Sequence, residues 1–273
     1  MTTAFDEYER LRWTGQAAAF RDSFAALCAH PAPDLLDAAG AGDGTRLLDA
    51  GSGTGTIAAL AVERGAKVTA VDAEPSMLDL LRDRLPAADI RHAVLPDLPF
   101  PDGAFDAAVA NFVINHVGDP LAALHELRRV VRPGGRVAVT IWPYPVPAAQ
   151  QLWGTVFDAA GAERPAGLPR LTPDKDFPRT AEGLSGLLVR AGLTEVTADT
   201  LPWIHRTDPE AWWSGPANGI GTPGLILTSQ TPAMIRTIRA RYDELVTPYL
   251  DTDGRLALPT AAVLASATVA QGG

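Results

Sequence analysis

Apolar and polar residues alternate between residues 41 and 142 in a pattern that predicts strands and helices in turn. The short apolar run Arg46–Gly51 ends in glycine and precedes a helical stretch at Ile57–Arg64. The pattern then predicts strand Lys67–Asp72, helix Pro75–Leu85, strands Ile90–Leu95 and Phe105–Val113, helix Pro120–Val131 and strand Arg136–Trp142. Such an alternation is typical of a mainly parallel sheet with helices on both faces.

The N-terminal segment has a different pattern. Residues 1–40 have apolar positions at roughly helical spacing, interrupted by Pro31 and Pro33. We expect these residues to form a helical lid, and residues 41–142 to form the α/β core of the molecule.

Past the core, regular elements alternate with proline-rich or tryptophan-rich segments. Residues 180–201 predict a core helix and a strand, and residues 255–273 predict a final core strand and tail, which completes seven strands. Residues 143–179 and 202–254 interrupt these elements, and the second segment has an amphipathic stretch near 232–245. We expect both to be insertions that cap the carboxyl edge of the sheet.

Composition and charge exclude several classes of protein. The 273 residues suffice for one or two domains, and 23 basic against 32 acidic residues give a net charge of −9. This charge disfavours a nucleic-acid partner, because affinity for phosphates comes from Lys and Arg. No apolar run reaches the length of a membrane span, and no secretory signal is visible at the N-terminus. The single cysteine, Cys28, fits a reducing compartment, so a cytoplasmic location is expected.

A glycine-rich loop joins the first predicted strand to the first predicted helix. Gly51, Gly53 and Gly55 allow positive φ angles and a close approach of the backbone to a ligand. The helix that follows offers free N–H groups. The spacing is G-x-G-x-G, whereas the dinucleotide fingerprint is G-x-G-x-x-G, and Thr56 occupies the third glycine position of that fingerprint.

Two acidic residues indicate which nucleotide the loop would bind. Asp49 lies two residues before the first glycine, where a carboxylate would repel a pyrophosphate and attract an ammonium or sulfonium group. Asp72 ends the second strand, 19 residues after Gly53, where an acid can accept hydrogen bonds from ribose hydroxyls. The alternatives are a turn-stabilising role for Asp49 and a helix-capping role for Asp72 before Pro75.

Four segments together resemble a class I S-adenosylmethionine-dependent methyltransferase. They are LLDAGSGTG (47–55), VTAVDAEPSML (68–78), LPFPDGAFDAAVANFVINHV (98–117) and LHELRRVVRPGGRVAVTIW (124–142). The chain is most similar to the small-molecule methyltransferases of the ubiquinone and menaquinone biosynthesis type. The resemblance implies a Rossmann-like fold, with S-adenosylmethionine as cofactor and S-adenosylhomocysteine as product.

The resemblance also implies roles for individual positions. Asp49 and the backbone of Gly51, Ser52, Gly53, Thr54 and Gly55 would surround the methionine moiety, and Asp72 would bind the ribose. Ala73 and Met77 would pack on the adenine, and the backbone of Asn111 would contact the methionine end. The family often has an aspartate for the adenine amino group where this chain has Val94, so the backbone of Val94 and Leu95 would serve the adenine edge instead.

The catalytic and acceptor residues have weaker signals, because methyl transfer mainly requires alignment of the reactants and exclusion of water. His116 follows the fourth strand and is a candidate general base; its alternative role is packing or capping near Pro120. His205 could face the acceptor or lie at a surface strand end. Aromatic residues that could line an apolar acceptor site, or simply pack the cap, are Tyr8, Trp13, Trp142, Tyr144 and Trp203.

The sequence therefore predicts a metal-independent methyltransferase that acts on a small, substantially hydrophobic molecule, for example in natural-product biosynthesis. No N/D-P-P-Y/F element follows the fourth strand, which disfavours methylation of nucleic-acid bases, and no His/Cys/Asp cluster has metal-ligand spacing. One alternative is a protein such as a cyclase that binds the same cofactor without methylating. A nicotinamide-dependent oxidoreductase is disfavoured by the glycine spacing, by Asp49 and by the lack of a Tyr-x-x-x-Lys pair. Membrane partners are not expected, and the oligomeric state is left open.

Overall fold

The computed structural model describes residues 3–271, and its strands form one seven-stranded sheet. Their order across the sheet is β3-β2-β1-β4-β5-β7-β6. The strands are β1 (Arg46–Ala50), β2 (Lys67–Asp72), β3 (Asp89–His92), β4 (Phe105–Asn111), β5 (Val131–Ile141), β6 (Leu193–Thr207) and β7 (Leu256–Val269).

The sheet is parallel except for β7, which pairs antiparallel with both β5 and β6. The predicted seven-stranded, mainly parallel sheet is confirmed. Its order differs from the 3-2-1-4-5-6 order of dinucleotide-binding domains, because the antiparallel strand is inserted before the last one. The strand order reverses between β1 and β4, and ligands of such sheets bind outside the carboxyl ends at this point.

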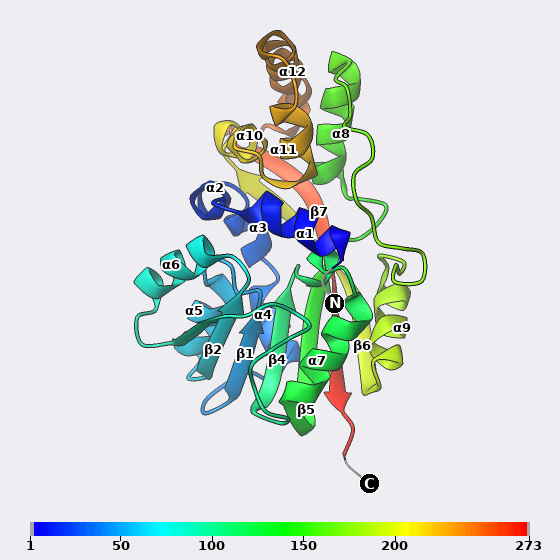
Figure 1. Ribbon diagram of the computed structural model, residues 1–273. Coiled ribbons are helices and arrows are strands. Elements are labelled where there is room, and N and C mark those ends of the chain that lie inside the picture. Colours follow the sequence, from blue (N-terminus) through cyan, green and yellow to red (C-terminus); the bar gives the residue numbers. More distant parts are fainter. Residues whose placement is uncertain (1–2, 272–273) are drawn as a thin grey trace.

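Helices cover both faces of the sheet and its carboxyl edge (Figure 1). The helices are α1 (Ala4–Trp13), α2 (Ala17–Asp22), α3 (Ala25–Ala29), α4 (Ala32–Ala38), α5 (Thr56–Glu63), α6 (Pro75–Arg84), the 3-10 turn η1 (Ile114–His116), α7 (Pro120–Val130), α8 (Ala148–Ala160), α9 (Ala181–Arg190), α10 (Pro209–Ala217), α11 (Gly221–Thr228), α12 (Pro232–Leu245) and the 3-10 turn η2 (Thr247–Tyr249). Among the described residues, no helix combines the length and the apolar composition that a bilayer crossing requires.

The alternation of side chains along the strands builds two cores. Leu47 of β1 packs with residues of α4, α5 and α6, whereas its neighbour Leu48 packs with residues of α7 and α9 on the other face. Both leucines are fully buried, as expected for a parallel strand that is covered on both sides. The rigid sheet that results places the loops after β1, β2 and β4 at one edge.

The N-terminal segment divides into four short helices, of which only the first three lie over the carboxyl edge (Figure 1). α4 belongs to the core instead of the lid, because Leu35 and Leu36 are fully buried against the sheet. Gly15, with φ of 72°, separates α1 from α2. We use the name lid for residues 3–30 below.

β6 and β7 are longer than the other strands and leave the sheet together as a two-stranded ribbon (Figure 1). Their pairing continues to Thr207↔Leu256, whereas the pairing of β5 with β7 stops at Ile141↔Val263. The predicted end of the strand at Leu201 was therefore wrong. Residues 202–207 continue β6, and the cap consists of the outer ribbon with α8 and α10–α12.

Further boundaries differ from the predictions, among them the end of β4, which lies at Asn111 and not at Val113. Residues 143–179 contain α8, which carries buried apolar residues at helical spacing after Pro147. β3 ends at His92, so Val94 and Leu95 lie in the following loop, where Asp97 N donates to Val94 O. Extended backbone begins at Val131, directly after α7, and not after the Pro-Gly-Gly turn.

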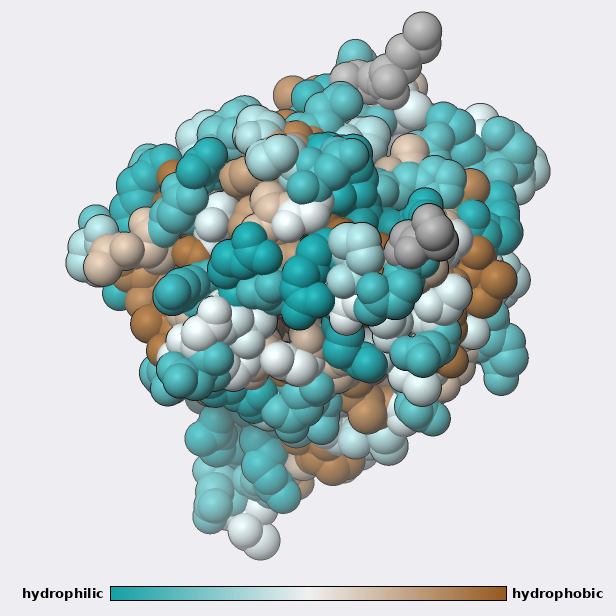
Figure 2. All heavy atoms as spheres, turned by 90° about the horizontal axis from the view of Figure 1, so that it is seen from below, coloured by the Kyte–Doolittle hydropathy of each residue, from teal (hydrophilic) through white to brown (hydrophobic). Residues whose placement is uncertain are grey.

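The opposite end of the sheet is mostly hydrophilic, as Figure 2 shows. A hollow of about 610 Å³ lies there at the amino ends of β1 and β2, lined among others by Arg46, Lys67 and Arg84. It is remote from the carboxyl ends of the strands, where ligands of parallel sheets bind, and it is not part of the candidate site.

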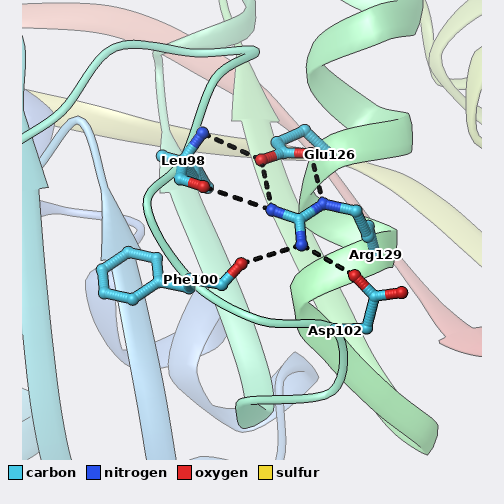
Figure 3. A network of polar contacts seen from close by, with 5 residues as sticks. All are labelled: Leu98, Phe100, Asp102, Glu126 and Arg129. Carbon is cyan, nitrogen blue, oxygen red and sulfur yellow. Dashed lines mark hydrogen bonds and ion pairs between the residues drawn. The ribbon is translucent and has the colours of Figure 1, made fainter.

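A charged clamp fixes the loop that leads from β3 into β4 (Figure 3). Arg129 of α7 donates to the carbonyl oxygens of Leu98 and Phe100 at 3.2 and 2.8 Å, and to the carboxylates of Asp102 and Glu126. Glu126 also accepts a hydrogen bond from Leu98 N at 2.8 Å. One guanidinium thus satisfies several groups of a loop that has no regular structure of its own.

Arg129→Met should lower the free energy of unfolding by about 1–2 kcal/mol, because loop carbonyls and Glu126 lose a charged donor while the side-chain stem keeps its packing. Urea denaturation monitored by circular dichroism measures the change. Arg82→Met is the matched control, because Arg82 pairs only with Asp79 and both side chains are largely exposed. Equal stability of the two variants would contradict the role of the clamp.

Candidate functional site

The glycine loop after β1 forms a backbone cradle at the carboxyl edge of the sheet. Gly51, Gly53 and Gly55 have φ angles of 72°, 52° and 85°, which favour glycine. A Cβ atom on Gly51 would lie 2.3 Å from the side chain of Val113, and one on Gly55 would lie 2.1 Å from Leu81. The predicted loop geometry is present, and close packing adds a second reason for the glycines at both ends of the loop.

Asp49 is a fully buried carboxylate with no hydrogen-bond partner on either oxygen. Burial, with a smaller contribution from the charge of Asp72, raises the pKa of Asp49 from 3.8 to about 7. A buried charge without a partner is costly, and a cationic ligand removes most of that cost. The site therefore has a position that suits an ammonium or sulfonium group.

Asp72 lies at the end of β2 and faces the cradle. Its two oxygens accept hydrogen bonds from Gly53 N at 2.8 Å and from Glu74 N at 2.9 Å, and burial raises its pKa. These two bonds fix the carboxylate next to the loop, and each oxygen keeps a lone pair for a further donor such as a ribose hydroxyl. The predicted helix cap before Pro75 is provided by Glu74, whose side chain accepts from Ser76 N.

The positions expected around the adenine lie beside Asp72. Met77 is buried and Ala73 is partly buried, with the Ala73 carbonyl 3.0 Å from His92 Nε2. Val94 and Leu95 are partly buried in the loop after β3. The structure thus gathers the backbone and apolar groups assigned to the base, whose roles stay predictions.

The lid closes over the cradle through aromatic and charged contacts. Phe20 is 3.9 Å from the position of a Cβ on Gly53, and Gly15 N donates to Glu74 at 3.2 Å. Trp13 stacks edge-on against both Phe20 and His116, at centroid distances of 5.6 and 5.5 Å. These contacts bring two predicted site residues, Trp13 and His116, to the edge of the cradle.

His116 has a partner that the sequence did not reveal. Its Nδ1 is 2.7 Å from a carboxylate oxygen of Glu9, the only buried residue of α1, and Arg12 donates to the other oxygen at 3.1 Å. Burial acts to raise the pKa of Glu9, but the contacts with His116 and Arg12 outweigh it, and the net shift is downward. Glu9 is therefore an ionised residue that orients the imidazole and leaves Nε2 free of this contact.

A second connection joins the lid to the end of β4. Asn111 Nδ2 donates to the carbonyl of Cys28 at 2.8 Å, and Asn111 Oδ1 accepts from Thr140 at 2.6 Å. The next residue, Phe112, has a φ of 57° in the left-handed region, and its ring stacks on Trp142 at 3.9 Å. Strained backbone of this kind is concentrated at functional sites. Here the Phe112 side chain packs with residues of the cap.

Two of the predicted acceptor residues are brought together in the cap. Trp203 is buried, stacks on His30 at 4.6 Å and lies 6.4 Å from Trp142. His205 is also buried, and its burial lowers the pKa to about 4, so the ring is neutral at pH 7. The alternative placement of His205 at the surface is wrong.

The remaining two predicted acceptor residues are not brought into this group. Tyr144 is 69% exposed, and Tyr8 lies under the guanidinium of Arg12 at 5.3 Å. No group of three or more His, Cys, Asp or Glu side chains suited to a metal ion is found within residues 3–271.

Sequence reasoning did not assign a role to Glu9 or Phe112. Glu9 could have been found, because it precedes Trp13 by four residues and shares its helix face.

Comparison with known proteins agrees with this geometry. Residues 48–139 match the family described as methyltransferase domain. A malonyl-[acyl-carrier protein] O-methyltransferase from Serratia marcescens is 41% identical over 44% of this chain and 47% of that protein. A demethylmenaquinone methyltransferase from Clavibacter sepedonicus is 44% identical over 35% of this chain and 40% of that protein. The chain thus matches these two curated relatives over about half of their length.

Solved structures share the fold across most of the chain. YcgJ from Bacillus subtilis superimposes with a TM-score of 0.55 at 17% identity, covering 89% of this chain and 99% of that one. A phosphoethanolamine N-methyltransferase of Haemonchus contortus, solved with S-adenosylhomocysteine, gives a TM-score of 0.51 at 18% identity, covering 88% and 52%. The match of residues 48–139 and the shared fold confirm the resemblance to class I S-adenosylmethionine-dependent methyltransferases that was seen in the sequence.

The burial of Asp49 without a partner predicts how the stability of the unliganded protein depends on pH. Because folding raises the pKa of Asp49, its protonated form is favoured in the native state, and stability falls as pH rises from about 4 to about 7. Asp49→Asn lacks this titration. The free energy of unfolding of the variant minus that of the wild type should grow over this pH range, by up to about 1.4 kcal/mol per pH unit, and level off above it. The difference between the two thermal midpoints should follow the same course. Differential scanning calorimetry of both proteins measures the difference, and a difference that is constant with pH would contradict the burial of an uncompensated charge.

Proposed function

We propose that this chain transfers the methyl group of S-adenosylmethionine to a small, largely hydrophobic organic acceptor that binds between the lid and the cap. The observation that carries the proposal is the buried, unpartnered carboxylate of Asp49 beside a glycine cradle. S-adenosylmethionine presents a positively charged tail to such a site, whereas a nicotinamide dinucleotide presents a diphosphate.

The residues around the cradle fit this cofactor. Asp49 and the backbone of residues 51–55 would hold the methionine moiety, and Asp72 would accept the ribose hydroxyls. Ala73 and Met77 would pack on the adenine, with the Val94 and Leu95 backbone at its edge. The backbone of Asn111 would contact the methionine end, held in place by the bonds of its side chain to the lid and to β5.

The cofactor supplies a methyl group on a sulfonium, which is already a good electrophile. The lid excludes water from the site by packing Trp13 and Phe20 over the cradle. His116 would accept the proton of an acceptor hydroxyl at Nε2, while Glu9 holds Nδ1 and stabilises the imidazolium that forms. Glu9 comes from the lid, so this pair is complete only when the lid is closed.

The acceptor is proposed to be hydrophobic because the elements that face the lid carry aromatic side chains. Phe112, Trp142 and Trp203 form a row from the end of β4 into the cap. The relatives act, by their names, on malonyl-[acyl-carrier protein] and on demethylmenaquinone. A role in natural-product biosynthesis and independence from metal ions remain part of this proposal.

Asp72→Ala should weaken the affinity for S-adenosylmethionine at least several-fold, because a charge-assisted hydrogen bond to a hydroxyl contributes roughly 1.5–3 kcal/mol. Isothermal titration calorimetry measures this change. Asp97→Ala is the control, because Asp97 is an exposed acid in the loop after β3. An unchanged affinity would remove Asp72 from the ribose site.

Formation of methylated product by the wild type, detected by mass spectrometry with a panel of phenols and carboxylic acids, separates transfer from mere cofactor binding.

Glu9→Gln and His116→Asn should each lower turnover at least tenfold with little change in cofactor affinity, because they disable one proton-accepting pair. The double variant should be no slower than His116→Asn alone, since Glu9 acts through His116. Glu7→Gln, on the exposed side of the same helix, is the control. Additive losses in the double variant, or full turnover in His116→Asn, would show that the pair only packs the lid.

A further inference from the structure

Buried polar side-chain atoms without a protein partner occur in two places within the described part of the chain. The first is the cradle, where both oxygens of Asp49 and the hydroxyl of Ser52 have none. The second is the cap, where the atoms are Gln150 Nε2, Trp153 Nε1, Trp203 Nε1, His205 Nε2 and Trp212 Nε1. Because the first set lies where the cofactor is proposed to bind, the second set calls for a similar explanation.

The five cap atoms come from three elements that pack together. His205 of β6 lies 5.7 Å from Trp212 of α10, and Trp153 of α8 lies 6.5 Å from Trp212, measured between ring centroids. Gln150 Oε1 accepts from Thr260, the residue that pairs with Trp203 across the ribbon. The atoms therefore belong to one cluster inside the cap.

The local structure turns these side chains inward. In the outer part of β6, Trp203, His205 and Thr207 are buried while the residues between them are exposed, which places the three on one face of the ribbon. Gln150 and Trp153 are three residues apart on α8 and share a helix face. The same faces would be filled by leucine or phenylalanine if packing were their only role.

Four of the five cap atoms are hydrogen-bond donors, and the fifth, His205 Nε2, donates or accepts according to the tautomer of the neutral ring. Three indole N–H groups and one amide N–H₂ can only donate, and the oxygen of that amide is already occupied by Thr260. The buried acidic side chains of residues 3–271 are Glu9 and Asp49, and neither lies in the cap. An unpaired buried donor is unfavourable, so a molecule that offers oxygen acceptors between these rings would be favoured over one that offers none.

The cluster is continuous with the cofactor edge. Trp142 stacks on Phe112 at the end of β4 and lies 6.4 Å from Trp203, and Phe24 of the lid lies 5.0 Å from Trp212. In Figure 1 the cap helices stand beyond the lid helices, on the side of the sheet where the cradle lies. A molecule held by the cap can thus extend toward His116 and the cradle.

We propose that the cap interior binds the methyl acceptor and that this acceptor is a flat, conjugated molecule with at least two oxygen atoms that accept hydrogen bonds and with no ammonium group. Trp203, Trp212 and Trp153 donate to those oxygens, and the surrounding rings stack on its plane. The identification of the bound molecule as the methyl acceptor rests on the proposed function. Its binding in the cap requires neither the cofactor nor methyl transfer.

The test uses three bicyclic probes of similar size: 1-hydroxy-2-acetonaphthone, which has two adjacent oxygens, 2-ethylnaphthalene, which has none, and 1-naphthylmethylamine, which carries an ammonium. Binding is followed on the full chain by ¹H–¹⁵N spectra of the tryptophan indole groups, with and without S-adenosylhomocysteine. The ketone should shift the indole signals of Trp153, Trp203 and Trp212 downfield, as new hydrogen bonds do. It should bind at least tenfold more tightly than the hydrocarbon, and the amine should bind weakest.

Two variants complete the design. Trp203→Phe keeps the ring and removes the N–H, and should weaken ketone binding several-fold while cofactor binding is retained. Trp213→Phe is the matched control. Trp213 follows Trp212 on α10, but it lies under the guanidinium of Arg239 and is not among the unpartnered donors. Equal binding of ketone and hydrocarbon, tighter binding of the amine, or indole signals that no probe moves would each overturn the proposal. Loss of cofactor binding alone would instead count against the proposed function.

Discussion

The structure depends on one electrostatic constraint: a carboxylate is buried without a partner at the carboxyl end of β1. Asp49 lies there because β1 is covered on both faces and the glycine loop turns directly above it. A protein tolerates such a charge where a ligand supplies the missing cation. The switch point of the sheet, the three left-handed glycines and Asp72 then surround that position, so the fold and the charge specify the same ligand.

In the proposed function, the lid and the cap bind and position the methyl acceptor beside the cofactor. Trp13 and Phe20 pack together over the cradle, and Glu9 of the same lid contacts His116. In the proposed mechanism, closure of the lid therefore also positions the imidazole. The ribbon of β6 and β7 carries the cap to the other side of the lid. The two sets of unpartnered polar atoms differ in character: the cradle has a carboxylate and a hydroxyl, whereas the cap has four N–H donors and one imidazole nitrogen.

The fold followed from local patterns in the sequence, whereas much of the site did not. Every strand was predicted, and the amphipathic stretch near 232–245 coincides with α12, because the hydrophobic period is a local signal. The continuation of β6 was missed, since Pro202 and His205 weaken an apolar alternation that becomes evident only beside β7. The pairing of Glu9 with His116 joins residues 107 positions apart, and no local pattern encodes such a contact. The role of Asp49 in cofactor binding stays a prediction, and its burial without a partner is the observation that supports it.

The most direct test of the central claim is calorimetric titration of S-adenosylmethionine into the protein at pH 6, in two buffers that differ in ionisation enthalpy. If the cationic tail pairs with Asp49, binding should release close to one proton per site, because the carboxyl group that is protonated in the free protein ionises on binding. Binding without proton release, or no binding at all, would contradict the account.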